Sequence, residues 1–336
     1  YVAAENDEPK EVVLDESDEL WVKFRHEHIG VVTRNVTSDL KKFIDSNRVS
    51  SAVRDSHSTL RDFSKAIKAI PQYKKELSTH CTHLNMVQYC AEKYKDGMSR
   101  LCKVEQELAL GTNVTGEKVD DHMKDIAPIL LDKMVSNYDK VRIILLYVLS
   151  KNGISDESFN KMVKTAQLSP ADKRAIVNLT LLGFNVVDNA KIKKPCLNKI
   201  ILRGERHRDS IEIGDIGDTY EFSRWIPVVK YIMEDCIGNK LDPKRFPFVT
   251  PRTIITEPPP ISARFSGGAS NKKKENKQLN ERLPKLIVFI IGGMTYSEMK
   301  CAYEVTNSTK NWEVIIGSSC IITPKDFIEN LSNISQ

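Results

Sequence analysis

The segment that decides the fold is SRLCKVEQELALGTNVTGEKVDDHMKDIAPILLD, residues 99–132, in which a turn with two glycines separates two stretches of periodic apolar residues. Upstream of the turn, apolar residues recur every three or four positions, the spacing of a heptad seam. No proline occurs from residue 72 to residue 110, so we predict one helical arm about 60 Å long, given a rise of about 1.5 Å per residue. The seam consists of Leu84, Val87, Ala91, Tyr94, Met98, Leu101 and Leu108, with Glu105 at one of its positions.

After the turn, the same periodicity predicts a second helical arm that begins at Val119. Pro128 lies inside this arm, and because proline lacks an N–H and crowds the carbonyl one turn earlier, we predict a kink there. Together the arms predict a helical hairpin over about residues 71–134, with its tip at Gly111–Lys118. The apolar positions of the second arm are Val119, Met123, Ile126 and Leu130.

Two interpretations of this hairpin stay open. Apolar stripes on helices usually face the protein's own interior, which predicts a helical scaffold with an internal seam. Arms of this length, however, exceed what a small domain covers, which favours a surface for a partner helix. Glu105 within the seam is typical of a polar residue that sets register or partner choice at some cost in stability.

The tip also resembles a phosphate-binding loop, because Gly111 and Gly116 are separated by four residues and Lys118 follows shortly after. Such a loop needs a strand before it, a lysine directly after the second glycine, and then serine or threonine for the metal. Here a helix is predicted upstream, Glu117 takes the lysine position, and Val119 follows Lys118. We therefore predict a flexible hairpin tip, with a nucleotide-binding loop as the alternative.

Composition and charge exclude several classes of function. The 336 residues favour about two domains, and 50 basic against 45 acidic residues give a formal charge of only +5, which indicates no nucleic-acid partner. Seven cysteines without a CxxC pair fit a reducing, cytoplasmic compartment. No apolar run is long enough for a membrane span. The chain begins YVAAENDE without a methionine, so we expect it to be part of a longer protein.

The middle of the chain is predicted to be a compact group of short helices. Their predicted boundaries are marked by Ser136 with Asp139, Asn152-Gly153, Ser155, Ser169-Pro170 with Asp172, and Gly183. The basic segment 191–218 and the segment 252–282, which contains EPPP and NKKKENK, are predicted to be loops. Residues 220–235 between them return to dense hydrophobicity.

The last segment changes to an α/β pattern. LIVFII, residues 286–291, is a continuous apolar run typical of a strand buried on both faces, and Gly292-Gly293 is predicted to end it. A helix around 299–303, a strand at 312–316 and a helix after Thr323-Pro324 complete a β-α-β-α unit. Two central strands are too few for a stable sheet, so other chain must complete it. EVVL at 11–14 is a candidate edge strand.

A catalytic or metal-binding constellation is absent from the sequence. His80, Cys81, His83 and Cys90 lie in the long helical pattern without a zinc spacing, and His26 and His28 fall on different faces of a helix. No G-x-S-x-G or H-E-x-x-H motif occurs. We expect no metal, no cofactor and no enzymatic activity, and the sequence indicates an interaction protein.

Seven longer blocks carry a likeness to a known family: LWVKFRHEHI, KVEQELALGT, YDKVRIILLYVLSKNGIS, SRWIPVVKYIMED, IVFIIGG, EMKCAYEVT and WEVIIGS. In this order they closely resemble the SM (Sec/Munc) proteins, which bind syntaxin in vesicle fusion, and among them the branch that serves exocytosis. The likeness runs from about Glu11 to the last helix and is weak at 191–218 and 252–282.

The resemblance implies a multidomain α + α/β fold. Residues 1–29 would end the first half of the family's α/β domain 2, residues 30–270 would form the mainly helical domain 3 with the long hairpin, and residues 271–336 would form the closing half of domain 2. The family's first domain, which contributes much of the grip on syntaxin, has no counterpart in the chain. The incomplete sheet fits this division.

The resemblance also implies a function for the hairpin. In the family it can extend and hold the vesicle SNARE beside the target SNARE, so the expected partners are a syntaxin-type target SNARE, a synaptobrevin-type vesicle SNARE and the assembled SNARE complex. The expected location is the cytoplasm, with peripheral recruitment to the plasma membrane through syntaxin. The expected SNARE-binding residues are Leu101, Glu105, Leu108, Gly111, Gly116, Lys118, His122, Met123, Ile126 and Pro128. Exocytic relatives tend to have a proline hinge where this chain has His122.

Overall fold

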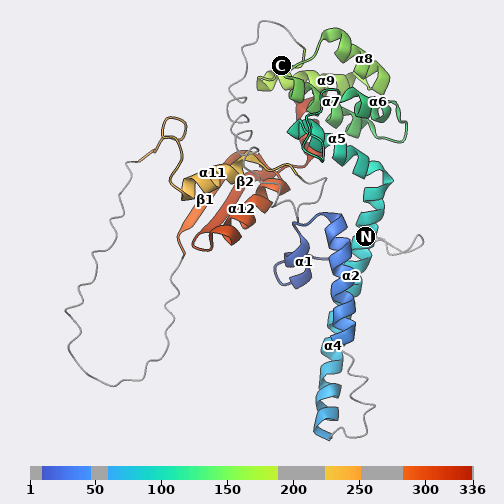
Figure 1. The fold of residues 1–336 in the computed structure, drawn as a ribbon, viewed down its shortest axis with the longest axis vertical. Helices are drawn as coiled ribbons and strands as arrows, with labels where there is room; N and C mark the ends of the chain where they lie inside the picture. Colours follow the sequence, from blue (N-terminus) through green and yellow to red (C-terminus); the bar gives the residue numbers. More distant parts are fainter. Residues whose placement is uncertain (1–9, 47–59, 188–223, 251–282, 335–336) are drawn as a thin grey trace, which may run out of the picture. The chain divides into compact units, whose positions relative to one another are not determined.

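The computed structural model describes residues 10–46, 60–187, 224–250 and 283–334 (Figure 1). The chain divides into two compact units, one formed by Tyr1–Trp225 with Pro324–Gln336 and the other by Ile226–Thr323. The first unit is helical, and the second contains a parallel two-stranded sheet. The predicted α + α/β fold class is confirmed. The predicted loops 191–218 and 252–282 lie outside the described residues. The predicted domain bounds stay predictions.

Three helices form a small core at the beginning of the first unit. They are α1 (Glu19–Phe24), α2 (Ile29–Ser46) and α4 (Leu60–Lys93), and α2 runs alongside α4 (Figure 1). Val36 and Phe24 are buried between them with Val87. Asp18 begins α1 by accepting the N–H of Trp21, and its other oxygen lies 2.7 Å from Nε2 of the buried His83 on α4. This hydrogen-bonded contact joins the two helices.

The predicted long arm is a helix with one irregularity. α4 continues through a π-helical turn, η1 (Tyr94–Met98), into α5 (Ser99–Leu110), and it begins at Leu60 rather than near residue 71. A π turn widens the hydrogen-bonding loop by one residue and thus rotates the helix face that follows. The seam consequently serves two cores: Val87 packs with α1 and α2, whereas Leu101 and Leu108 pack into the helical body.

The helical body begins where α5 ends. It consists of α6 (Met123–Leu131), α7 (Asn137–Lys151), α8 (Asp156–Ala166), α9 (Pro170–Asn178), the 3-10 turn η2 (Leu179–Leu182) and α13 (Pro324–Asn333). Ser136, Ser155 and Ser169 begin α7, α8 and α9, each by accepting a backbone N–H three residues later. Gly183, at φ +86°, ends η2. These predicted boundaries are confirmed.

The second arm of the hairpin differs from its prediction. Residues 112–122 form no helix, and α6 begins at Met123 and contains only nine residues. The N–H of Val119 donates to the carbonyl of Gly111, so the chain crosses back on itself instead of winding. The prediction that the arm begins at Val119 is therefore wrong. The spacing of apolar residues does not reveal the hydrogen bond from Val119 back to Gly111.

The second unit contains α11 (Val228–Ile237), β1 (Lys285–Met294), α12 (Tyr296–Thr309) and β2 (Glu313–Ile321). β1 and β2 pair in parallel from Lys285 opposite Glu313 to Met294 opposite Ile321. The predicted β-α-β order is confirmed. Met233 of α11 and Val305 of α12 lie in the core that covers one face of the strands.

Three details of the predicted sheet are wrong. β1 continues past the two glycines, because Gly292 adopts φ +119° at a register shift and the pairing resumes at Gly293. One face of β1 is exposed, with Phe289 and Ile291 64% and 92% accessible, so the strand is not buried on both faces. Residues 11–14 form no strand.

Asn178 provides a test of the packing between α9 and α13. Its buried side-chain amide donates to the carbonyls of Leu331 and Ile334 at 2.7 and 3.2 Å, at the end of α13 where helical carbonyls lack partners. We expect Asn178→Ala to lower the free energy of unfolding by about 1–3 kcal/mol, since it removes a buried donor that serves two carbonyls at the end of α13.

Denaturant unfolding measures this change, with Asn160→Ala as the matched control. Asn160 is exposed and bonds only to Asp156 and Lys173 among the described contacts, so its loss should cost less than about 0.5 kcal/mol. Equal effects of the two substitutions would contradict the role of Asn178.

Candidate functional site

The tip of the predicted hairpin is a closed turn. Gly111 ends α5 in the left-handed region at φ +73°, and a bridge pairs Thr112 with Lys118 in antiparallel sense. Inside the turn, the N–H of Asn113 donates to the carbonyl of Glu117 at 2.8 Å, and the side chain of Asn113 accepts the N–H of Glu117 at 2.9 Å. The turn is thus closed by hydrogen bonds among its own residues, from both backbone and side chain.

This geometry differs from that of a phosphate loop. α5, not a strand, precedes the turn, and the next helix begins only at Met123. The Nζ of Lys118 lies 3.2 Å from a carboxylate oxygen of Asp120, and both side chains are 83% accessible. The lysine therefore points to solvent beside an acidic residue, without the strand-loop-helix context that phosphate binding needs.

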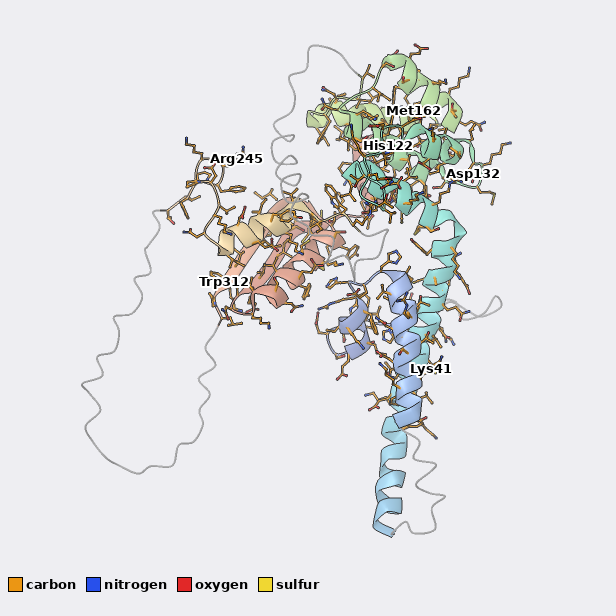
Figure 2. The ribbon with its side chains drawn as sticks, viewed as in Figure 1. Lys41, His122, Asp132, Met162, Arg245 and Trp312 are labelled. Carbon is orange, nitrogen blue, oxygen red and sulfur yellow. The ribbon has the colours of Figure 1, made fainter. Side chains whose placement is uncertain are left out.

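The apolar residues predicted to bind a SNARE lie in the core. Leu101, Leu108 and Ile126 are 8%, 3% and 0% accessible, and they share one cluster with residues of α7, α8 and α9. Met123 is partly buried against the same cluster. Figure 2 shows the helical body that contains them. In this conformation the anchors are therefore not available to a partner helix.

The presence of Glu105 at a seam position is explained by an ion pair inside the first unit. Its carboxylate lies 2.6 Å from the guanidinium of Arg142 on α7, and Arg142 also contacts Asp139 at 3.2 Å. Burial raises the pKa of Glu105, and Arg142 opposes that shift. Glu105 thus aligns α5 with α7. A polar residue in the seam is predicted to set helix register, and here it does so between two helices of the same chain.

His122 lies at the start of α6 and is 6% accessible (Figure 2). Burial lowers its pKa, the positive charge of Lys151 lowers it further, and Asp125 and Asp121 act in the opposite direction. Pro128 lies within α6. His122 therefore precedes the short second arm and Pro128 lies inside it, while Gly116, at φ +82°, shapes the turn before it.

No role for Arg224 or Gln106 is evident from the sequence. The guanidinium of Arg224 donates to the carbonyls of Asn113 and Thr112 at 2.7 and 3.2 Å. The side-chain oxygen of Gln106 accepts the backbone N–H groups of Arg224 and Trp225 at 2.9 and 2.7 Å. More than 100 residues separate these partners, so no local pattern could reveal them. The segment fastens the turn to α5.

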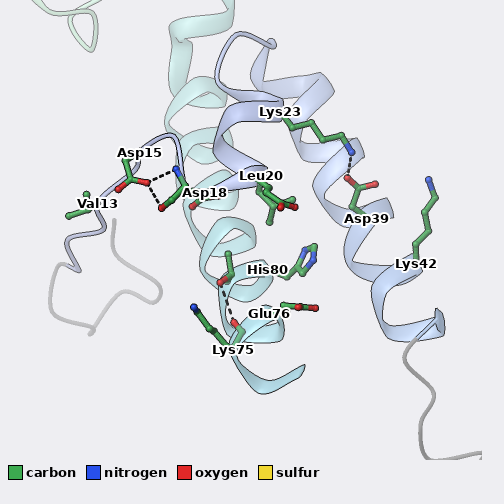
Figure 3. A pocket seen from close by; sticks show the side chains of 13 residues that line it. Val13, Asp15, Asp18, Leu20, Lys23, Asp39, Lys42, Lys75, Glu76 and His80 are labelled. Atoms are coloured by element: carbon green, nitrogen blue, oxygen red, sulfur yellow. Dashed lines mark hydrogen bonds and ion pairs between the residues drawn. The ribbon is translucent and has the colours of Figure 1, made fainter. Parts of the chain in front are cut away.

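A groove of about 730 Å³ lies elsewhere in the first unit, between α1, α2 and α4 (Figure 3). Lysines and carboxylates alternate around it, and Lys23 already pairs with Asp39 there. His80 lines the groove with its ring 4.8 Å from that of Phe43. Because charges of both signs line the groove, it favours no ligand of one charge.

The sequence cluster of histidines and cysteines is dispersed along α4. His83 binds Asp18, His80 packs on Phe43, and Cys81 is exposed. Over the described ranges, no three metal-ligating side chains come together. Among the helices within those ranges, none combines the length and the apolar character needed to cross a bilayer.

Comparison with known proteins identifies the family. Residues 1–330 match the Sec1 family. The chain is 32% identical to the protein transport protein sec1 of Dictyostelium discoideum, over 96% of the chain and 53% of that protein, and 25% identical to that of Schizosaccharomyces pombe, over 96% and 45%. The chain belongs to the Sec1 family and spans about half of the length of these curated relatives.

Solved structures support the same fold. The Unc18–syntaxin 1 complex from Monosiga brevicollis contains a chain with 29% identity and a TM-score of 0.73, matched over 100% of this chain and 54% of that one. The SM protein Vps45 in complex with the Qa SNARE Tlg2 matches with a TM-score of 0.63 at 15% identity, over 96% of this chain and 51% of that one. The latter likeness concerns the fold alone.

The burial of the seam predicts a large stability effect at Leu108. We expect Leu108→Ala to lower the free energy of unfolding by about 2–5 kcal/mol, because it leaves a cavity in the core of the helical body. Leu131→Ala is the control, since Leu131 is 66% accessible and should cost less than about 0.5 kcal/mol. Chemical unfolding measures the free energy of unfolding of both variants. A negligible effect of Leu108→Ala would mean that the seam is exposed in solution.

The lowered pKa of His122 predicts a pH dependence. Because the folded-state pKa lies below the usual 6.5, the unfolded chain binds this proton more readily, and stability falls as the pH drops below about 6.5. Burial also lowers the pKa of His28, which adds a contribution of the same sign. We expect His122→Gln to lose less stability than the parent chain between pH 7.5 and 5.5 in thermal melts. An equal loss in both proteins would refute the assignment.

Proposed function

We propose that the chain is the SNARE-binding part of a non-catalytic regulator of vesicle docking and fusion in exocytosis. The observation that carries this proposal is the likeness, over the whole chain, to the Unc18 chain of a complex with syntaxin 1. The proposed partners are a syntaxin-type target SNARE, a synaptobrevin-type vesicle SNARE and the assembled complex. The proposed location is cytoplasmic, with recruitment to the plasma membrane through syntaxin, and the domain bounds proposed are 1–29, 30–270 and 271–336.

The proposed mechanism is that the hairpin opens and presents its seam to the vesicle SNARE. Amphipathic helices bind grooves through apolar anchors at heptad spacing, and Leu101, Leu108, Met123 and Ile126 supply such anchors. Exposing an apolar side chain of this size costs about 1.5–3 kcal/mol. The closed form therefore predominates without a partner, and the SNARE helix would have to bury the same surface again.

The turn and the polar positions would set the direction of opening. Gly111 and Gly116 allow the left-handed backbone of the turn, and Lys118 faces solvent at its end. Glu105 would have to leave Arg142, which places a buried ion pair in the path of opening. His122 and Pro128 lie in or beside α6, where a helix that lengthens the second arm would have to form.

The alternative is a helical scaffold whose seam is permanently internal. It is favoured by the complete burial of Ile126 and by the 3% accessibility of Leu108. In that case the chain would bind SNAREs through other surfaces or would not bind them.

Calorimetric titration of the 336-residue chain tests the proposal, with the heptad segment of a synaptobrevin-type SNARE and the SNARE segment of a syntaxin as separate ligands. We expect saturable binding of the vesicle SNARE. Ile126→Asp should weaken that binding, whereas Ile291→Asp, on the exposed face of β1, should leave it unchanged. Binding that is unaffected by Ile126→Asp would favour the internal scaffold.

A further inference from the structure

The segment Arg224–Trp225 is held against the turn and α5 by four hydrogen bonds. Two run from the guanidinium of Arg224 to backbone carbonyls of the turn, and two run from backbone N–H groups to the side-chain oxygen of Gln106. The two bonds from the guanidinium are charge-assisted, and the planar guanidinium donates to two neighbouring carbonyls at once. The segment at Arg224 is therefore joined to α5 and to the turn that follows α5, both more than 100 residues earlier in the sequence.

A buried carboxylate on α5 contributes to the electrostatic surroundings of this partly buried contact. Glu107, one residue after Gln106, is 4% accessible. Burial raises the pKa of its carboxyl group, and the charges of Lys103 and Arg224 oppose that shift while Asp125 adds to it. The positive charge of Arg224 thus favours the ionised carboxylate of Glu107, but Lys103 does so more strongly and burial outweighs both.

The turn itself supplies the acceptors at a fixed place. The carbonyl of Asn113 accepts both Arg224 and the N–H of Gly116, at 2.7 and 3.1 Å. The internal bonds between Asn113 and Glu117 keep that carbonyl oriented. A change in the conformation of the turn would therefore remove the acceptors of Arg224, and loss of Arg224 would free the turn to move.

We propose that Arg224 and Gln106 form a latch that keeps the turn 111–119 folded against α5 and so limits the opening of the hairpin. Arg224 is a positioning residue in this account, because it acts through the turn and not by touching a partner. The predicted consequence for binding rests on the proposed function: releasing the latch makes the open form more populated and increases the apparent affinity for the vesicle SNARE.

Hydrogen exchange of the 336-residue chain tests the latch itself. In Arg224→Gln, amide exchange at residues 112–119 should become at least about tenfold faster. Hydrogen bonds from a charged donor shift the equilibrium between the closed and the locally opened turn by about this factor. Arg224→Lys should restore part of the protection, and Gln106→Ala should reproduce the effect. Arg245→Gln is the matched control, since Arg245 contacts Asp242 at the surface of the second unit.

Titration of the same variants with the heptad segment of a synaptobrevin-type SNARE separates a latch from a merely structural contact. A latch predicts tighter binding in Arg224→Gln, whereas structural damage would weaken it. Unchanged exchange at 112–119 would overturn the inference whatever the binding shows. Faster exchange with unchanged or weaker binding would overturn the regulatory role. Absence of binding by the parent chain would reject the proposed function, and exchange alone would then decide whether the latch exists.

Discussion

The burial of one face of α5 is the constraint on which the first unit depends. Leu101 and Leu108 fill the space between α5 and the helices that follow, and the Glu105–Arg142 ion pair fixes the register of α5 on α7. A largely buried ion pair of this kind contributes little net stability but is costly to separate, so it favours one alignment. The same side chains are the heptad anchors that a partner helix would use. On the proposed function, core packing and partner binding would therefore compete for one surface.

On that proposal, such competition would turn binding into a conformational equilibrium. The turn at the end of α5, the short α6 and the segment at Arg224 all belong to the closed form. Each contributes contacts that would be lost on opening, and the partner must replace their free energy. The π turn at 94–98 separates this region from the core of α1, α2 and α4, so opening would leave the Asp18–His83 contact in place. If the hairpin opens in this way, a seam that is buried in the closed form does not conflict with the proposed SNARE binding.

Sequence reasoning succeeded where the signal is local. Ser136, Ser155 and Ser169 each begin a helix through a side-chain contact within three residues, and the β-α-β order follows from apolar runs of the right length. It failed where distant contacts decide: a periodic pattern at Val119 is overridden by its bond to Gly111. The candidate anchors were identified as apolar and periodic, but their burial depends on α7 to α9. Arg224 had no local signature.

The measurement that tests the central claim most directly is hydrogen exchange of the chain with and without a saturating vesicle-SNARE segment. If the buried seam is the binding surface, exchange should change throughout 111–131, because the turn and α6 must rearrange when the partner binds. Protection in the core of α1, α2 and α4 should stay the same. Binding that leaves 111–131 unchanged would contradict the account and would mean that the seam serves only as the core.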